Sequence, residues 1–269
     1  MDKSTNKKPN IIIILADDLG YSDLGCYGSE IKTPNIDKLG NNGLKFSQFY
    51  NQARCSPSRA SLMTGLTGHQ AGVGQLSGDL GAPGYRGFIN TNCVTVAEVV
   101  KQEGYDTYIS GKWHLGGHWD PREKDLWQAG TENHPLPTQR GFDEFYGFCS
   151  GHWGDYFTPP LELNGQIVKG NGFCIDDFTD KAIAFIEDST RNKKPFFAYV
   201  PYNTPHSPMQ VPDKWWDKFK DKKIKMRNRD PRRENLGHLR CALAMCENID
   251  WNVGRILKKI DDLNLRDNT

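Results

Sequence analysis

The sequence predicts an α/β fold in which a mostly parallel central sheet carries helices on both faces. Ile11 to Leu15 is a continuous, mainly β-branched run, typical of a strand buried on both faces in a parallel sheet. Two further apolar runs, Tyr105 to Ser110 and Phe196 to Val200, indicate strands, and segments with helical patterns follow them. With 269 residues, of which 37% are hydrophobic, the chain is long enough for one large domain of this class.

After the first strand, the sequence predicts a short helix and a candidate strand. Thr33-Pro34 is a good helix start, and Gly40 or Gly43 is a good end. Phe46 to Tyr50 is the candidate strand. Residues 1–9 are expected to be a disordered polar N-terminus, and residues 10–269 are expected to form one domain without an internal linker.

The middle of the chain contains a helix, a strand and a long irregular region. Thr95 to Glu98 forms a capping box, so a helix is expected there, ending at Gly104 before the strand from Tyr105. Residues 115–172 are rich in Gly, Pro, Trp and His and predict long loops with short elements, where α/β enzymes place substrate contacts. Their tryptophans, and Trp113 before them, either stack on substrate rings or simply pack.

Two helices are expected in the last third. Asp176 to Asp188 is amphipathic, and Leu239 to Leu263 has apolar residues at helical spacing. The segment from Lys218 to Arg233 is dense in basic residues. It is either a solvated surface loop or a rim that attracts polyanionic substrates.

Composition narrows the class of partner. The chain has 34 Lys+Arg and 33 Asp+Glu, and it contains no apolar run of the length that spans a bilayer, so we expect neither nucleic acid nor membrane as a partner. The lysine-rich N-terminus contains no hydrophobic signal segment, so either a signal has been removed or the protein is cytoplasmic. Seven scattered cysteines show no zinc-like spacing, and one disulfide remains open.

The most informative stretch is Cys55-Ser56-Pro57-Ser58-Arg59. Ser56 is a good N-cap, Pro57 suits the first helical position and Gly65 is a good stop, so a short helix is expected. A helix N-terminus favours anions, and a cysteine there is expected to be reactive. Arg59, one turn on, adds a permanent planar cation suited to a tetrahedral oxyanion. A purely structural cysteine and arginine are the alternative.

Reactive side chains also follow three predicted strands. Asp17 and Asp18 come directly after the first, Lys112 and His114 after the second, and His206 after the third. Because ligands bind outside the carboxyl ends of strands in open α/β sheets, these residues predict one pocket. Adjacent carboxylates suit Ca²⁺ or Mg²⁺, although Asp also favours turns. Either histidine is also compatible with a structural role.

Taken together, these motifs resemble those of type I, formylglycine-dependent sulfatases of the arylsulfatase type, within the alkaline-phosphatase-like superfamily. Cys-x-Pro-x-Arg at 55–59 is similar to their signature, and Gly111 to Gly116 is similar to their second signature. Pro9-Asn10 with the segment to Gly20, Arg140 to Asp143, Thr204-Pro205-His206 and the closing helix match in order, over roughly residues 9–269.

The resemblance implies a mechanism. A maturation enzyme would oxidise Cys55 to formylglycine (3-oxoalanine), whose hydrated aldehyde attacks sulfur to form a covalent sulfate ester, from which its second hydroxyl expels sulfate. Asp17, Asp18 and residue 55 would hold Ca²⁺, with Mg²⁺ as an alternative, and Arg59 would stabilise the hydrated aldehyde. Lys112 and His206 would bind sulfate oxygens, and His114 would help to deprotonate that hydroxyl. His152 is a further candidate for substrate binding. The family implies a periplasmic or secreted protein.

The resemblance also implies a part that the chain lacks. In sulfatases, another strand with an Asp-Asn pair of metal ligands follows the closing helix, and Asp267-Asn268 follows a helix instead. We therefore expect a truncated catalytic domain without that strand or the C-terminal subdomain, and weak or no activity. The favoured function is hydrolysis of aryl or carbohydrate sulfate monoesters. The alternatives are a related phosphomonoester, phosphodiester or phosphonate hydrolase, and a non-catalytic fragment that binds sulfated glycans.

Overall fold

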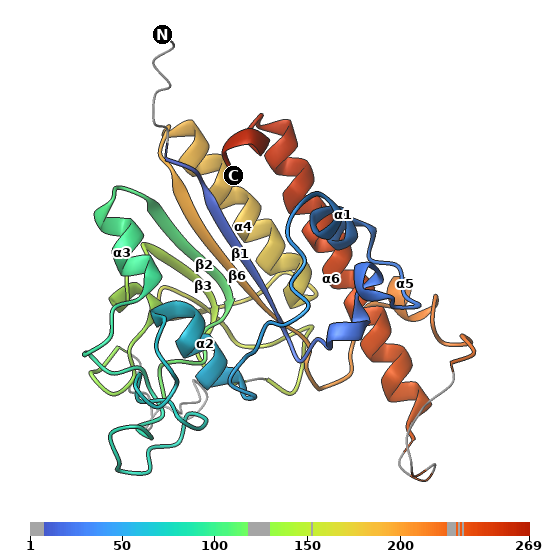
Figure 1. Ribbon diagram of the computed structural model, residues 1–269, viewed down its shortest axis with the longest axis horizontal. Coiled ribbons are helices and arrows are strands. Elements are labelled where there is room, and N and C mark those ends of the chain that lie inside the picture. The colour runs from blue at the N-terminus through green and yellow to red at the C-terminus, as the bar shows by residue number, and fades with distance from the viewer. Residues whose placement is uncertain (1–7, 118–129, 152, 225–229, 231, 233) are drawn as a thin grey trace.

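The part of the chain that the structure describes forms a six-stranded mixed sheet in the order β1-β6-β2-β3-β4-β5 (Figure 1). The computed structural model describes residues 8–117, 130–151, 153–224, 230, 232 and 234–269. Within them the strands are β1 (Ile11–Asp17), β2 (Asp106–Lys112), β3 (Glu144–Phe148), β4 (Leu161–Leu163), β5 (Gln166–Val168) and β6 (Phe196–Pro205). The first four strands of that order are parallel, and β4 and β5 are antiparallel to their neighbours.

Helices cover both faces of the sheet, as the sequence predicts. The helices are α1 (Pro34–Asn42), α2 (Cys55–Thr64), α3 (Val96–Gln102), α4 (Cys174–Arg191), α5 (Asp213–Trp216) and α6 (Leu236–Asp262). Figure 1 shows α4 and α6 on one side of the sheet and α2 and α3 on the other, and each side has its own apolar core. The predicted fold class is therefore confirmed.

β1 is an edge strand. The sequence predicted that its residues would be buried, and they are only partly buried. It pairs with β6 alone among the described strands. Its side chains alternate as they should: Ile11, Ile13 and Leu15 pack against one core, and Ile12 and Ile14 against the other. Because no described strand covers its outer edge, these residues are half-buried rather than buried.

Two local predictions were wrong. The segment from Phe46 to Tyr50 is not a strand; Phe46, Phe49 and Tyr50 are exposed, so no packing partner favours an extended ladder there. The helix expected from Ser56 begins one residue earlier, at Cys55. The short elements expected within residues 115–172 include the strands β3, β4 and β5.

The remaining elements lie close to their predicted places. The capping box at Thr95 and Glu98 is present, with the Glu98 carboxylate accepting from the Thr95 N–H at 2.6 Å. The predicted strand at Phe196 is twice as long as expected and extends to Pro205.

All seven cysteines are free, so the disulfide that the sequence left open is not formed.

The two ends of the described chain meet at one end of the sheet. Asn10 donates its backbone N–H to the carbonyl of Asn268 at 2.7 Å, and Lys8 forms an ion pair with Glu103 at 2.8 Å. Residues 1–7 of the expected disordered segment, and part of the basic stretch after Lys218, lie outside the described residues. Among the described residues, no helix is both long enough and apolar enough to cross a bilayer.

Candidate active site

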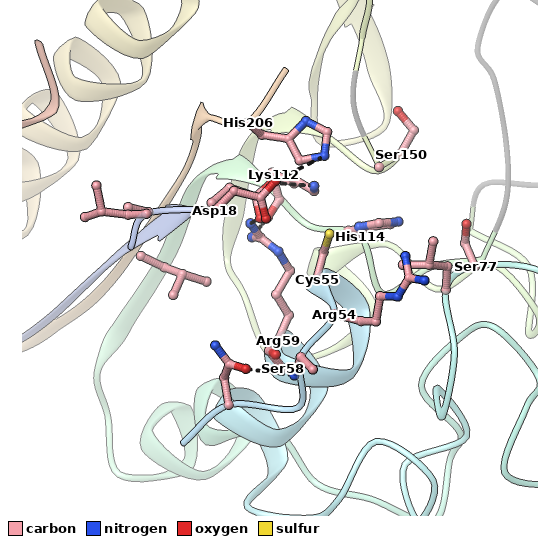
Figure 2. Close-up of a pocket in the computed structure, with 18 of the residues that line it drawn as sticks. Asp18, Arg54, Cys55, Ser58, Arg59, Ser77, Lys112, His114, Ser150 and His206 are labelled. Carbon is pink, nitrogen blue, oxygen red and sulfur yellow. Dashed lines mark hydrogen bonds and ion pairs between the residues drawn. The ribbon is translucent and has the colours of Figure 1, made fainter. Parts of the chain in front are cut away.

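The carboxyl ends of β1, β2 and β6 meet the start of α2 around a pocket of about 920 Å³ (Figure 2). This is the edge of a parallel sheet where strand ends leave room for a ligand. Seven of the eight site residues predicted from the sequence line this one pocket: Asp17, Asp18, Cys55, Arg59, Lys112, His114 and His206. The eighth, His152, lies outside the described residues.

Helix α2 presents Cys55 and Arg59 to the pocket. Cys55 is its first residue, Arg54 is its N-cap and Gly65, with φ of 71°, ends it. Ser56, which the sequence predicted as the N-cap, is instead buried, and its hydroxyl has no hydrogen-bond partner among the described groups. This shift places the Cys55 side chain, which is partly exposed, at the very end of the helix.

A buried cluster of charges lies next to Cys55. The Asp17 carboxylate contacts Lys112 Nζ at 2.6 Å and Arg59 Nη2 at 3.3 Å. Arg59 Nη1 also donates to the Lys112 carbonyl at 2.8 Å. Because two cations share one carboxylate, the cluster carries a net positive charge and favours an anion in the pocket.

The pKa values in this cluster follow from burial and from the neighbouring charges. Burial of Asp17 by itself raises the pKa of its carboxyl, but Arg59 and Lys112 outweigh it and hold that pKa below its usual value. Burial lowers the pKa of Lys112, the nearby charge of Arg59 lowers it further, and Asp17 only partly opposes them. Asp17 is therefore an ionised buried carboxylate.

His206 and Asp18 lie side by side in the lining of the pocket. His206 Nε2 lies 3.7 Å from Asp18 Oδ2, and His206 Nδ1 lies 2.6 Å from the carbonyl of Ser207. The backbone of His206 is held from the far side of the loop, because the hydroxyl of Tyr156 donates to its carbonyl at 2.6 Å. Tyr156 was not singled out in the sequence, since it lies 50 residues away within the irregular region.

His114 is held tightly by the segment after β3. It is buried, has a left-handed φ of 56° and donates its backbone N–H to the Cys149 carbonyl at 3.1 Å. A Cβ at Gly151 would lie only 2.9 Å from His114 Nε2, so a glycine leaves the space that the imidazole occupies. Ser150 and Gly151 line the pocket beside it, and no motif in the sequence marked them.

The tryptophans do not behave alike. Trp113 is fully buried and donates its indole N–H to the carbonyl of Pro135 at 3.0 Å, so it packs in the core. Trp153 is 6% exposed and lines the pocket. Trp119 and Trp127 lie outside the described residues.

The donor set is compatible with a hard divalent cation. Asp17, Cys55 and His206 each offer a ligand atom within 4.8 Å of the others, and Asp18 adds a second carboxylate beside His206. Carboxylate oxygens suit Ca²⁺ or Mg²⁺. The two aspartates supply at most four oxygens, so Ca²⁺, which takes 6–8, needs further oxygens from solvent, substrate or other groups.

The comparison with known families identifies the family of the chain. The family model described as Sulfatase matches residues 9–269. The chain belongs to the sulfatase family. Its resemblance to that family, first seen in motifs near positions 17, 55 and 112, therefore extends over nearly the whole sequence.

Individual sulfatases show the same extent of similarity. The arylsulfatase of Klebsiella aerogenes is 33% identical over 229 residues, which is 80% of this chain and 46% of that protein. An uncharacterized sulfatase of Schizosaccharomyces pombe is 28% identical over 99% of this chain and 57% of its own length. The crystal structure of Ps i-CgsB in complex with k-i-k-neocarrahexaose has a TM-score of 0.77 at 32% identity, covering 97% of this chain and 57% of that one. The chain thus spans about half the length of the relatives it matches.

Proposed function

We propose that the protein is a sulfuric ester hydrolase that cleaves sulfate monoesters of aryl or carbohydrate groups. The observation that carries the proposal is the buried cluster of Asp17, Arg59 and Lys112 next to Cys55, which makes this part of the pocket positively charged. Sulfuryl transfer places negative charge on the sulfate oxygens. Cations fixed in advance at that position stabilise this charge without reorganisation.

Cys55 is the position of the nucleophile in this proposal. Conversion to formylglycine by a maturation enzyme would supply a hydrated aldehyde hydroxyl there, and covalent catalysis splits one difficult displacement into two easier ones. The side chain is partly exposed at the first residue of α2, so both a maturation enzyme and a substrate can reach it. The N–H groups of that helix end also favour an anion.

The remaining pocket residues bind charge and move protons. Arg59 and Lys112 lie against Asp17. In this proposal Arg59 stabilises the hydrated aldehyde of residue 55, and Lys112 and His206 bind sulfate oxygens and assist the leaving group. His206 lines the pocket, where an imidazole can donate a proton to the departing oxygen. His114 lines the same pocket and acts as the base for the hydroxyl of residue 55.

A divalent cation fits beside these residues. Asp17 and Asp18 would hold Ca²⁺, or Mg²⁺ in its place, next to residue 55. Such an ion would supply Lewis-acid stabilisation of charge on the sulfuryl group. Carbohydrate sulfates are included in the proposed substrate class because the related Ps i-CgsB was solved in complex with k-i-k-neocarrahexaose.

The proposal is tested by hydrolysis of 4-nitrophenyl sulfate and 4-nitrophenyl phosphate, together with the mass of the peptide that contains residue 55. We expect faster turnover of the sulfate, a mass that matches formylglycine, and loss of turnover in Cys55→Ala. Cys26→Ala is the matched control, since Cys26 is the other partly exposed cysteine and lies outside the pocket. Wild-type turnover by Cys55→Ala, or preference for the phosphate, contradicts the proposal.

A further inference from the structure

Arg54 is a pocket residue to which nothing above gives a role. It is the N-cap of α2, its side chain is exposed, and it lines the pocket next to Cys55. Figure 2 shows its guanidinium extending toward Ser77, away from Asp18 and the charge cluster. The pocket wall formed by Arg54 and Ser77 is therefore separate from the wall formed by the strand ends.

The charges of the pocket divide into paired and unpaired groups. Arg59 and Lys112 share Asp17, and His206 lies 3.7 Å from Asp18. Arg54 forms no ion pair or side-chain hydrogen bond within the described part of the chain. A guanidinium keeps its charge at all ordinary pH values and binds planar or tetrahedral anions through two parallel N–H groups. An unpaired one at a pocket wall is a ready site for an anion from solution.

The pocket is large enough for that anion to be a second group on the substrate itself. A volume of about 920 Å³ lies at the upper end of the range of small-molecule sites, which hold whole drug-sized ligands. A single sulfuryl group next to Cys55 leaves most of this space for the rest of the substrate. A second charged group on the substrate can therefore reach the Arg54 wall while the ester lies against Arg59 and Lys112.

We propose that Arg54, with the Ser77 hydroxyl beside it, forms an anionic subsite that binds a second carboxylate or sulfate on the substrate. This inference rests on the proposed function, because it assigns the class of sulfate ester that the same pocket takes. The preferred substrates are esters with at least two negative groups, and Arg54 determines specificity rather than taking part in the chemistry.

The experiment measures binding, so that it does not depend on turnover. The dissociation constants of 4-nitrophenyl sulfate and of its derivatives with a carboxylate at ring position 2 or 3 are measured by calorimetry on the Cys55→Ala protein. The same series is repeated with Arg54→Gln added. Arg191→Gln is the matched control, because it removes one positive charge at the end of α4, which precedes the amino end of β6 and lies outside the pocket.

We expect at least one carboxylated ester to bind more tightly than the plain ester, and Arg54→Gln to reduce that preference about tenfold, as loss of a charged hydrogen bond does. Arg191→Gln should leave the preference as it is. The inference is overturned if Arg54→Gln weakens all esters by the same factor, if the preference does not change, or if no ester binds. Failure of the proposed function shows separately, as absence of 4-nitrophenyl sulfate hydrolysis by protein that retains Cys55.

Discussion

Two arginines are buried in the described part of this molecule, and their surroundings differ. Arg140, near the corner between α3 and β3, donates to Glu98 at 3.1 Å and to the carbonyls of Asn90 and Cys93 at 3.1 and 2.6 Å. Arg59, in the pocket, makes one backbone hydrogen bond, at 2.8 Å, and a longer contact with Asp17, at 3.3 Å. Its Nε and Nη2 have no hydrogen-bond partner among the described groups.

The difference distinguishes a structural arginine, whose donors bind groups of the chain, from an arginine whose donors are available to a ligand. Unsatisfied buried donors cost free energy, so spare donors on a buried guanidinium at a pocket call for a partner that the chain does not supply. Arg140 uses its donors on the chain itself. Arg59 is just as buried yet keeps spare donors beside Cys55, where the substrate is proposed to lie.

The largest effect is expected from Arg59→Lys, which keeps the charge and removes the fork of donors. Loss of a preorganised donor to transition-state charge costs roughly 10²–10³ in kcat. We expect a fall of that size in 4-nitrophenyl sulfate turnover, with a smaller loss of stability than in Arg140→Lys. If Arg59→Lys turns over at the wild-type rate, the spare donors of Arg59 have no catalytic role.

Arg140→Lys tests whether Arg140 contributes to stability rather than to catalysis. A lysine cannot reach Glu98 and the two carbonyls at once, so buried acceptors lose their partners. We expect the free energy of unfolding in urea to fall by about 3 kcal/mol, with kcat within a few-fold of wild type. If turnover falls as steeply as in Arg59→Lys while the protein stays folded, the two arginines do not differ as described.

Gly151→Ala tests how tightly the pocket holds His114. The new Cβ would lie 2.9 Å from His114 Nε2, so the imidazole must move. Small displacements of catalytic groups are costly, and we expect kcat to fall about tenfold. Gly154→Ala is the matched control, since Gly154 lines the same pocket and its Cβ would meet no atom within 4 Å. Equal kinetics of the two variants would show that His114 is not positioned by this contact.

Glu162 extends the comparison to buried acids. Asp17 lies between two cations and stays ionised, whereas burial raises the pKa of Glu162 to about 8, with the Cys149 N–H at 3.0 Å opposing it only in part. The folded chain therefore keeps a proton that the unfolded chain releases above its ordinary pKa of 4.5.

Stability from this proton is complete below pH 4.5 and is lost as the pH rises to about 8. Between those values we expect the free energy of unfolding of wild type to fall relative to Glu162→Gln, by at most about 1.4 kcal/mol for each pH unit. Urea unfolding of both proteins from pH 5 to pH 8 measures the difference. Parallel pH curves would mean that Glu162 is ionised when folded.

The sequence by itself determined the fold class, most helices and seven of the residues that line the pocket. Those signals are local: the β-branched run at Ile11, the capping box at Thr95 and the Cys55 motif each act over a few residues. Parallel strands bring their carboxyl ends to one edge, so Asp17, Lys112 and His206 could be placed in one pocket without coordinates.

Tertiary structure alone decided the ionisation state, the ion pairs and the orientation of those side chains. The edge position of β1, the strands β3 to β5, and the start of α2 at Cys55 depend on partners distant in the chain. The contrast between Arg59 and Arg140 has the same origin. Both arginines stand in motifs that the sequence shows, and the motifs do not tell their surroundings apart. Which of them keeps free donors is set by carbonyls and carboxylates from other segments, and no local pattern encodes those distances.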